Sequence, residues 1–170
     1  MTTESVGPEV HHAWAIYLRA SEEARRRGDR RTGTDHLLLA LLEDPSIEVA
    51  LGVTLQQARQ ANESLDHEAL GALGLVSGTD APALPMRAVP KKPRLRDVAT
   101  KDRLRMTPAA KKVLEAAVKP MRRKTQVTAQ QVLAQILILQ PPDPAAVLLG
   151  ALGVNTSEVR RRLDAVTPDS

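Results

Sequence analysis

The chain has 170 residues, of which 42% are hydrophobic, enough for one globular domain or two small repeats that share a core. Cysteine and phenylalanine are absent, and one Trp and one Tyr are the only aromatic residues. Disulfides and thiolate metal sites are therefore excluded, and a fold that stacks bases on aromatic side chains is poorly supported. Apolar runs are far shorter than the roughly 20 residues of a membrane span, and residues 1–9 lack an apolar signal segment. We expect a cytoplasmic protein that does not contact a membrane.

The positive charge of the chain is concentrated in one segment. The net charge is +4, but residues 86–105 alone carry +6, so the remaining residues sum to −2. Four prolines lie just before or within this segment, and we therefore predict that residues 77–105 form a linker. The linker either keeps the protein soluble or docks it on an acidic partner, which would be a protein surface or nucleic acid. The basic docking residues would be Arg87, Lys91, Lys92, Arg94, Arg96, Lys101, Arg103 and Arg105.

The residues before the linker predict helices. Apolar side chains recur at helical spacing over residues 9–28, with arginines in the last turn and Gly28 as the stop. Thr34 is the expected N-cap of a second helix, with Asp35 in its first turn. The run Leu37–Leu42 is apolar all round, which indicates a helix buried on every side.

Three further helices are expected before the linker. Pro45 starts a short one. Thr54 is the expected N-cap of a helix that ends near Ser64, and Asp66 caps a short helix that ends at Gly74. We also expect Trp14 to be a core anchor.

The residues after the linker follow the same plan. Two of the expected N-caps precede proline, which is favoured at the first helical position. Pro120 is expected to bend or end the first of these helices early, because proline lacks an N–H group. The expected N-caps of the second half are Thr107, Thr128 (or Thr125), Asp143 and Asn155.

An internal repeat links the two halves. The letters LGVTLQQAR at 51–59 match LGVNTSEVR at 152–160, in which Leu-Gly-Val precedes a polar cap. We expect left-handed backbone at Gly52, Gly74 and Gly153. Together these features predict an all-α fold with two pseudo-symmetric repeats of about four helices each. The expected boundaries are residues 1–76 for repeat one, 77–105 for the linker and 106–170 for repeat two.

Three stretches of the chain resemble a known family. Residues 20–45, which read ASEEARRRGDRRTGTDHLLLALLEDP, are similar to the Clp N-terminal repeat. MTPAAKKVLEAAV at 106–118 resembles the start of the second Clp repeat, and residues 143–163 resemble its end. The resemblance to the N-terminal domain of Clp ATPases implies two packed four-helix repeats that receive adaptors and substrate proteins.

The resemblance does not extend to the ATPase modules of the family. No Gly-x-x-x-x-Gly-Lys-Ser/Thr phosphate loop occurs among the residues, and no cofactor is expected. The resemblance therefore implies a stand-alone, ClpC-like N-domain protein. It would be a non-enzymatic adaptor, decoy or modulator of the ClpC–ClpP protease, with proteins or small peptide-like ligands as partners. The alternative function is a nucleic-acid-binding regulator that uses residues 87–105.

Four residues are candidate ligand contacts: Thr34, Asp35, His36 and Gln130. In ClpC-like domains the acidic residue of a Gly-Thr-Glu-His helix start helps to receive phosphoarginine, and Asp35 matches it in repeat one. Gln130 is the equivalent in repeat two, and its neutral side chain argues against two equal sites. The structural alternative is that Thr34 and Asp35 cap a helix and His36 belongs to the helix joint; both roles are compatible.

Two further expectations concern the sites. The phenylalanine usual at each repeat start is replaced by Met106 in repeat two and approximately by Glu9 in repeat one, so the apolar ligand groove of the family is expected to be altered or lost. No residue is assigned to catalysis or to a metal, because the histidines lack metal-ligand spacing and no serine nucleophile motif occurs.

Overall fold

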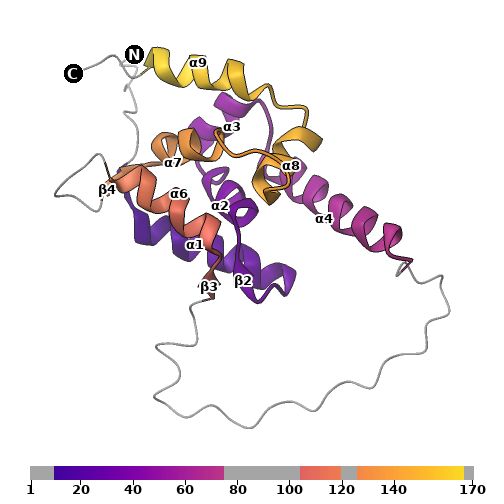
Figure 1. The fold of residues 1–170 in the computed structure, drawn as a ribbon. Helices are drawn as coiled ribbons and strands as arrows, with labels where there is room; N and C mark the ends of the chain where they lie inside the picture. Colours follow the sequence, from indigo (N-terminus) through magenta and orange to yellow (C-terminus); the bar gives the residue numbers. More distant parts are fainter. Residues whose placement is uncertain (1–9, 75–103, 120–125, 167–170) are drawn as a thin grey trace, which may run out of the picture.

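The computed structural model describes residues 10–74, 104–119 and 126–166, and these residues form eight helices and four strands of two or three residues (Figure 1). The all-α, two-repeat prediction is confirmed. The helices of repeat one are α1 (Ala13–Arg27), α2 (Thr34–Leu41), α3 (Pro45–Leu51) and α4 (Leu55–Ala72). The helices of repeat two are α6 (Pro108–Val118), α7 (Ala129–Ile136), α8 (Pro144–Ala151) and α9 (Thr156–Val166).

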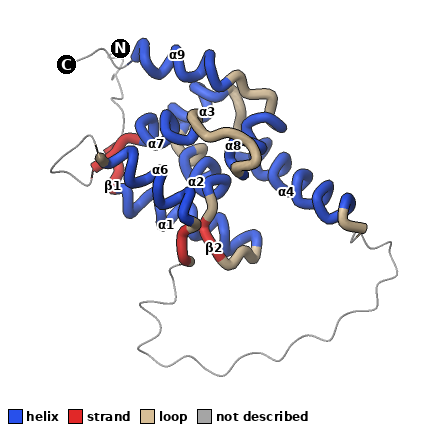
Figure 2. The backbone as a smooth tube through the Cα atoms, in the orientation of Figure 1, coloured by secondary structure: helices blue, strands red, loops and turns tan. Residues whose placement is uncertain are grey.

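Short strands join the two repeats. They are β1 (Val10–His12), β2 (Arg31–Thr32), β3 (Arg105–Met106) and β4 (Gln126–Thr128). β1 and β3 precede the first helix of each repeat, while β2 and β4 precede the second (Figure 2). β1 pairs with β4, and β2 pairs with β3, so each ladder connects different repeats. This exchange is what a pseudo-twofold axis produces. The first ladder is antiparallel and the second parallel, so the symmetry is approximate.

Helix packing follows the same exchange. α3 of repeat one packs on α9 of repeat two, and α4 packs on α8. The two Leu-Gly-Val joints, residues 51–53 and 152–154, line one small pocket together. α2 lies in the middle of the molecule, where it contacts α1, α7 and α8 (Figure 1). All eight of its residues are buried. Burial of the run Leu37–Leu42 was predicted, and the core around it is almost wholly aliphatic.

Most of the expected helix starts and stops are present. Gly28, Gly52, Gly74 and Gly153 all have positive φ angles. The N-caps Thr54 and Thr128 each accept a hydrogen bond from the backbone N–H three residues on, and their partners there, Gln57 and Gln131, accept one from the cap residue in return. Thr107 and Asp143 also accept cap hydrogen bonds before proline, and Asn155 accepts one from the N–H of Glu158.

Three expected helix boundaries were wrong. The first helix was expected from residue 9, but α1 begins at Ala13 because residues 10–12 form β1 and pair with β4. α4 is continuous to Ala72, and Asp66 lies inside it, where its carboxylate contacts Arg27 rather than a helix N-terminus. Thr34 is the first residue of α2, and Gly33 is the N-cap. The hydroxyl of Thr34 instead donates to Oδ1 of Asp143 at 2.7 Å and accepts from the backbone N–H of Ala145 at 3.3 Å. Thr34 thus connects the starts of α2 and α8.

We expect Thr34→Val to lower the free energy of unfolding by about 1–2 kcal/mol, because a buried hydroxyl that bonds a carboxylate is lost. Thr34→Ser keeps the hydroxyl and is the matched control, with a smaller expected loss. Urea denaturation of both variants measures the difference. Equal losses for the two variants would show that the hydrogen bonds of Thr34 do not contribute.

Part of the prediction concerns residues that the structure does not describe. Of the expected linker, residues 77–103 lie outside the described residues, as do Pro120 and Thr125. The repeat boundaries therefore stay predictions. Among the described helices, none has the length and apolar character that crossing a membrane requires.

Candidate functional site

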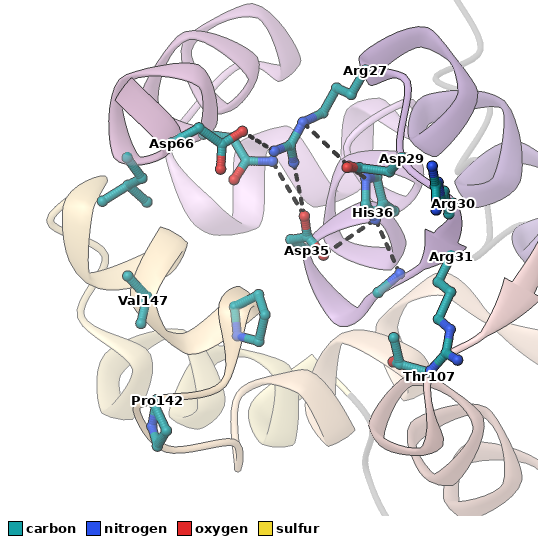
Figure 3. Close-up of a pocket in the computed structure, with 14 residues that line it drawn as sticks. Arg27, Asp29, Arg30, Arg31, Asp35, His36, Asp66, Thr107, Pro142 and Val147 are labelled. Atoms are coloured by element: carbon teal, nitrogen blue, oxygen red, sulfur yellow. Dashed lines mark hydrogen bonds and ion pairs between the residues drawn. The ribbon is translucent and has the colours of Figure 1, made fainter. Parts of the chain in front are cut away.

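A cavity of about 570 Å³ opens where repeat one meets repeat two, and we call it the charged cavity (Figure 3). Repeat one supplies the end of α1, the turn after it, the start of α2 and the middle of α4. Repeat two supplies the N-cap of α6, the loop before α8 and the first turn of α8. The polar lining residues are Arg27, Asp29, Arg30, Arg31, Asp35, His36, Asn62, Asp66 and Thr107. The others are Gly33, Leu65, Pro142, Pro144 and Val147.

Asp35 lies at the base of the charged cavity and is buried. Its Oδ2 accepts a hydrogen bond from Nη1 of Arg27 at 2.9 Å and a longer one from Nδ2 of Asn62 at 3.4 Å. The same guanidinium also contacts Asp66 through Nη2, and its Nε lies 3.7 Å from Oδ2 of Asp29. Figure 3 shows Arg27 reaching over the cavity toward these carboxylates. Arg27 therefore connects the end of α1 with α2 and α4.

His36 holds the first turn of α2 to the preceding turn. The backbone N–H of Gly33 donates to Nδ1 of His36 at 3.0 Å, and the same Nδ1 lies 3.2 Å from Oδ1 of Asp35. Nε2 lies 2.9 Å from Oδ2 of Asp29. The ring is buried and both nitrogens are engaged. These contacts place His36 in the helix joint, where it fixes Asp29 beside the cavity.

The Asp35 carboxyl is held in its charged form. Burial acts to raise its pKa, but the hydrogen bonds and charges of His36, Asn62 and Arg27 outweigh burial, so the pKa lies below its ordinary value. Burial likewise acts to lower the pKa of Arg27, but Asp66, Asp35 and Asp29 together raise it. The two groups therefore form an ion pair at neutral pH.

The lack of a side chain at Gly33 leaves the space that the Asp35 carboxylate occupies. A Cβ atom at position 33 would lie 2.4 Å from Oδ1 of Asp35, far inside van der Waals contact. The φ of Gly33 is −93°, which any residue adopts, so the requirement for glycine is one of space alone.

The structure separates the four candidate ligand contacts. Asp35 and His36 line the charged cavity, while Thr34 is directed toward α8 and does not. Gln130 is the second residue of α7, as Asp35 is of α2, but it does not line this cavity. Their roles as ligand contacts stay predictions. Of the basic docking residues, only Arg105 is described, and it is exposed on β3.

A second feature of the surface is a groove lined mainly by apolar side chains. This apolar groove has a volume of about 520 Å³. It is lined by Ala13, Trp14 and Tyr17 of α1, Met106 of β3, and Leu114, Glu115, Val118 and Lys119 of α6 and its end. Whether the apolar ligand groove of the family is altered stays a prediction. The prediction that Trp14 is a core anchor was wrong, because 47% of it is exposed.

The aromatic side of the groove has a fixed geometry. The ring centroids of Trp14 and Tyr17 lie 5.1 Å apart at an interplanar angle of 51°. The hydroxyl of Tyr17 donates to the backbone carbonyl of Leu104, just before β3. Because Tyr17 is buried, it forms a floor, and Trp14 forms an exposed wall. The groove therefore needs both repeats.

The comparisons with known proteins agree with this architecture. The model of the Clp repeat N-terminal domain matches residues 11–137, about three quarters of the chain. The chain belongs to this family. Clp N-domains are the non-catalytic protein-interaction modules of Clp ATPases, and they bind substrates and adaptors. No curated protein matches the chain.

A solved structure supports the fold of this Clp N-domain independently. The N-terminal domain of the chaperone ClpD from Arabidopsis thaliana superposes with a TM-score of 0.60. The two chains share 19% identity, and the match covers 92% of this chain and 94% of the ClpD domain. At this identity the likeness concerns the fold alone.

Proposed function

We propose that this Clp N-domain is a non-enzymatic protein-binding module of the cytoplasm that receives substrates, adaptors or ligands of a ClpC–ClpP-type protease. It acts on that protease as an adaptor, decoy or modulator. The observation that carries the proposal is the apolar groove between the repeats, in which a half-exposed tryptophan stands beside a buried tyrosine.

The chemistry of the groove suits a protein segment. Trp and Tyr are the residue types most enriched where protein partners gain binding energy, and a rigid aromatic pair loses little conformational entropy on contact. Met106, Leu114 and Val118 complete an apolar lining. Glu115 and Lys119 provide charges of both signs at its edge. A peptide segment of a partner protein could place one or two apolar side chains in the groove while its polar backbone faces Glu115 and Lys119.

Intrinsic fluorescence tests this proposal, because Trp14 is the only tryptophan of the chain. Titration with Trp-free peptides from a Clp substrate should shift its emission to the blue as the exposed half of the ring is covered. A shift that saturates supports binding at the groove. Peptides that bind without any change at Trp14 would place the binding surface elsewhere.

A variant separates the groove from the rest of the surface. We expect Trp14→Ala to weaken the binding of a labelled substrate peptide at least tenfold, or by about 1.4 kcal/mol. Val49→Ala is the matched control, because Val49 is an apolar side chain on α3 that is 80% exposed and lies outside the groove. Fluorescence anisotropy measures both affinities, and equal affinities for the two variants would contradict the assignment.

The role in proteolysis has its own test. The chain is added in excess to a ClpC–ClpP-type protease and a degradable substrate, and the rate of degradation is followed. A decoy slows degradation and an adaptor accelerates it, and Trp14→Ala abolishes either effect. No change in rate at concentrations that saturate peptide binding would remove the regulatory role.

A further inference from the structure

The charged cavity is separate from the apolar groove, and the two share no lining residue. We infer that Arg27 is a built-in occupant of a guanidinium site formed by Asp35 and Asp66, and that it closes this site to guanidinium groups of other molecules. The cavity has the groups that such a ligand requires, but the chain fills them with its own side chain.

The contacts of Arg27 use the full fork of its guanidinium. Nη1 bonds to Asp35, Nη2 bonds to Asp66, and Nε faces Asp29. The side chain of Arg27 is only 13% exposed. A planar guanidinium presents several donors in fixed directions, and carboxylates placed around it match this pattern as a single ammonium group does not.

Two of the carboxylates around Arg27 are also held by other groups. Asn62 donates to Asp35, and Nε2 of His36 contacts Asp29. Asp35 is fixed further by its position in the first turn of the buried helix α2. Removal of the guanidinium is therefore expected to leave the Asp35 side of the site in place.

The charge balance also favours a replacement cation. Asp29, Asp35 and Asp66 carry three negative charges, and Arg27 supplies one positive charge. A vacated site would take the Arg27 cation away from the buried Asp35 carboxylate, which is costly. Arg30 and Arg31 line the same cavity, and no ion pair recorded among the described residues joins them to these carboxylates.

The test uses the full chain and methylguanidinium as the probe. Arg27→Met keeps most of the apolar stem and removes the guanidinium. We expect methylguanidinium to bind this variant saturably, with shifts of the amide signals of Asp35 and Asn62 in NMR spectra. Its affinity for the wild-type chain should be at least tenfold weaker. Methylammonium is the control, and it should bind the variant several times more weakly than methylguanidinium does.

A second variant locates the site. Adding Asp35→Asn to Arg27→Met should abolish the binding of the probe. Equal binding of methylguanidinium to the wild-type chain and to Arg27→Met overturns the inference, and so does a folded Arg27→Met that binds no probe because Arg30 or Arg31 has taken the place.

A measurement on the wild-type chain keeps the inference testable if Arg27→Met does not fold. A clamped guanidinium should give an Arg27 Nε–Hε signal that exchanges with water at least tenfold more slowly than those of the exposed Arg30 and Arg31. Exchange at the same rate would overturn the inference. The peptide assays of the groove report on Trp14, so a failure here leaves the proposed function untouched.

Discussion

Asp35→Asn should lower the free energy of unfolding by about 3 kcal/mol at pH 7, because it removes one partner of a buried, hydrogen-bonded ion pair. The Arg27 guanidinium keeps its contact with the exposed Asp66 but loses the buried carboxylate. Chemical denaturation of the wild-type chain and the variant measures the difference. A loss below about 1 kcal/mol would show that the ion pair behaves as a surface pair.

Asp66→Asn is the matched control for Asp35→Asn. It removes a carboxylate from the same guanidinium, but the Asp66 side chain is 57% exposed. Its expected loss is less than about 1 kcal/mol, because solvent screens exposed ion pairs. A larger loss for Asp66→Asn than for Asp35→Asn would reverse the ranking of the two contacts.

The direction in which pH changes the stability difference between the wild-type chain and Asp35→Asn follows from the pKa of Asp35. The pKa of Asp35 is lower in the folded chain than the ordinary value of an aspartate side chain. Such a carboxyl stabilises the fold fully above its unfolded pKa, and the contribution is lost as the pH falls through the folded pKa. The stability difference between the wild-type chain and Asp35→Asn is therefore constant above about pH 5 and shrinks below about pH 4. The charged groups that face Asp35 are Arg27, Asp29 and Asp66, together with the His36 ring.

Gly33→Ala should lower the free energy of unfolding by about 2–3 kcal/mol through overpacking. The new Cβ atom would lie 2.4 Å from Oδ1 of Asp35, and this carboxylate cannot move freely because Arg27 and Asn62 hold it. Thermal and urea denaturation measure the loss. An unchanged stability would show that the carboxylate rotates away without cost.

Gly150→Ala controls for the general effect of replacing glycine. Gly150 lies inside α8, its φ is not positive, and a Cβ atom there meets nothing within 4 Å. Alanine should stabilise the helix by about 0.5–1 kcal/mol at that position. Gly33→Ala is therefore expected to lower the free energy of unfolding, and Gly150→Ala to raise it.

A double-mutant cycle identifies the atom responsible for the Gly33 effect. In an Asp35→Ala background the carboxylate is absent, so Gly33→Ala should cost much less than in the wild-type chain. The coupling between the two positions is expected to be about 1–3 kcal/mol. Additive losses would trace the effect of Gly33→Ala to some other contact.

The fold could be predicted from local signals that survive in the tertiary structure. Thr54, Thr107 and Asp143 cap helices as expected, because a side-chain oxygen before a helical run satisfies the first free N–H groups wherever the helix packs. The strands could not be predicted, since ladders of two or three residues are too short to show alternation. The prediction that Thr34 is an N-cap was wrong because its hydroxyl bonds instead to Asp143, which lies 109 residues away in the sequence.

The candidate sites show the same limit. The sequence indicated Asp35 through its position in a helix start, but it gave no sign of Arg27. The run Arg25–Arg27 was interpreted as a solvated helix end, and only the third arginine turns toward the cavity. Trp14 lies at a core-like spacing in the sequence, but in the structure it lines an open groove with residues of β3 and α6 and stays 47% exposed.

The crossed ladders β1–β4 and β2–β3 make the two repeats equivalent to subunits of a fused isologous dimer. In a true dimer, the strand of one subunit would meet its partner only as often as the protein concentration allows. Here both partners belong to one polypeptide, so each strand is present to the other at a constant effective concentration. The interface between the repeats therefore forms without dependence on how much protein the cell contains.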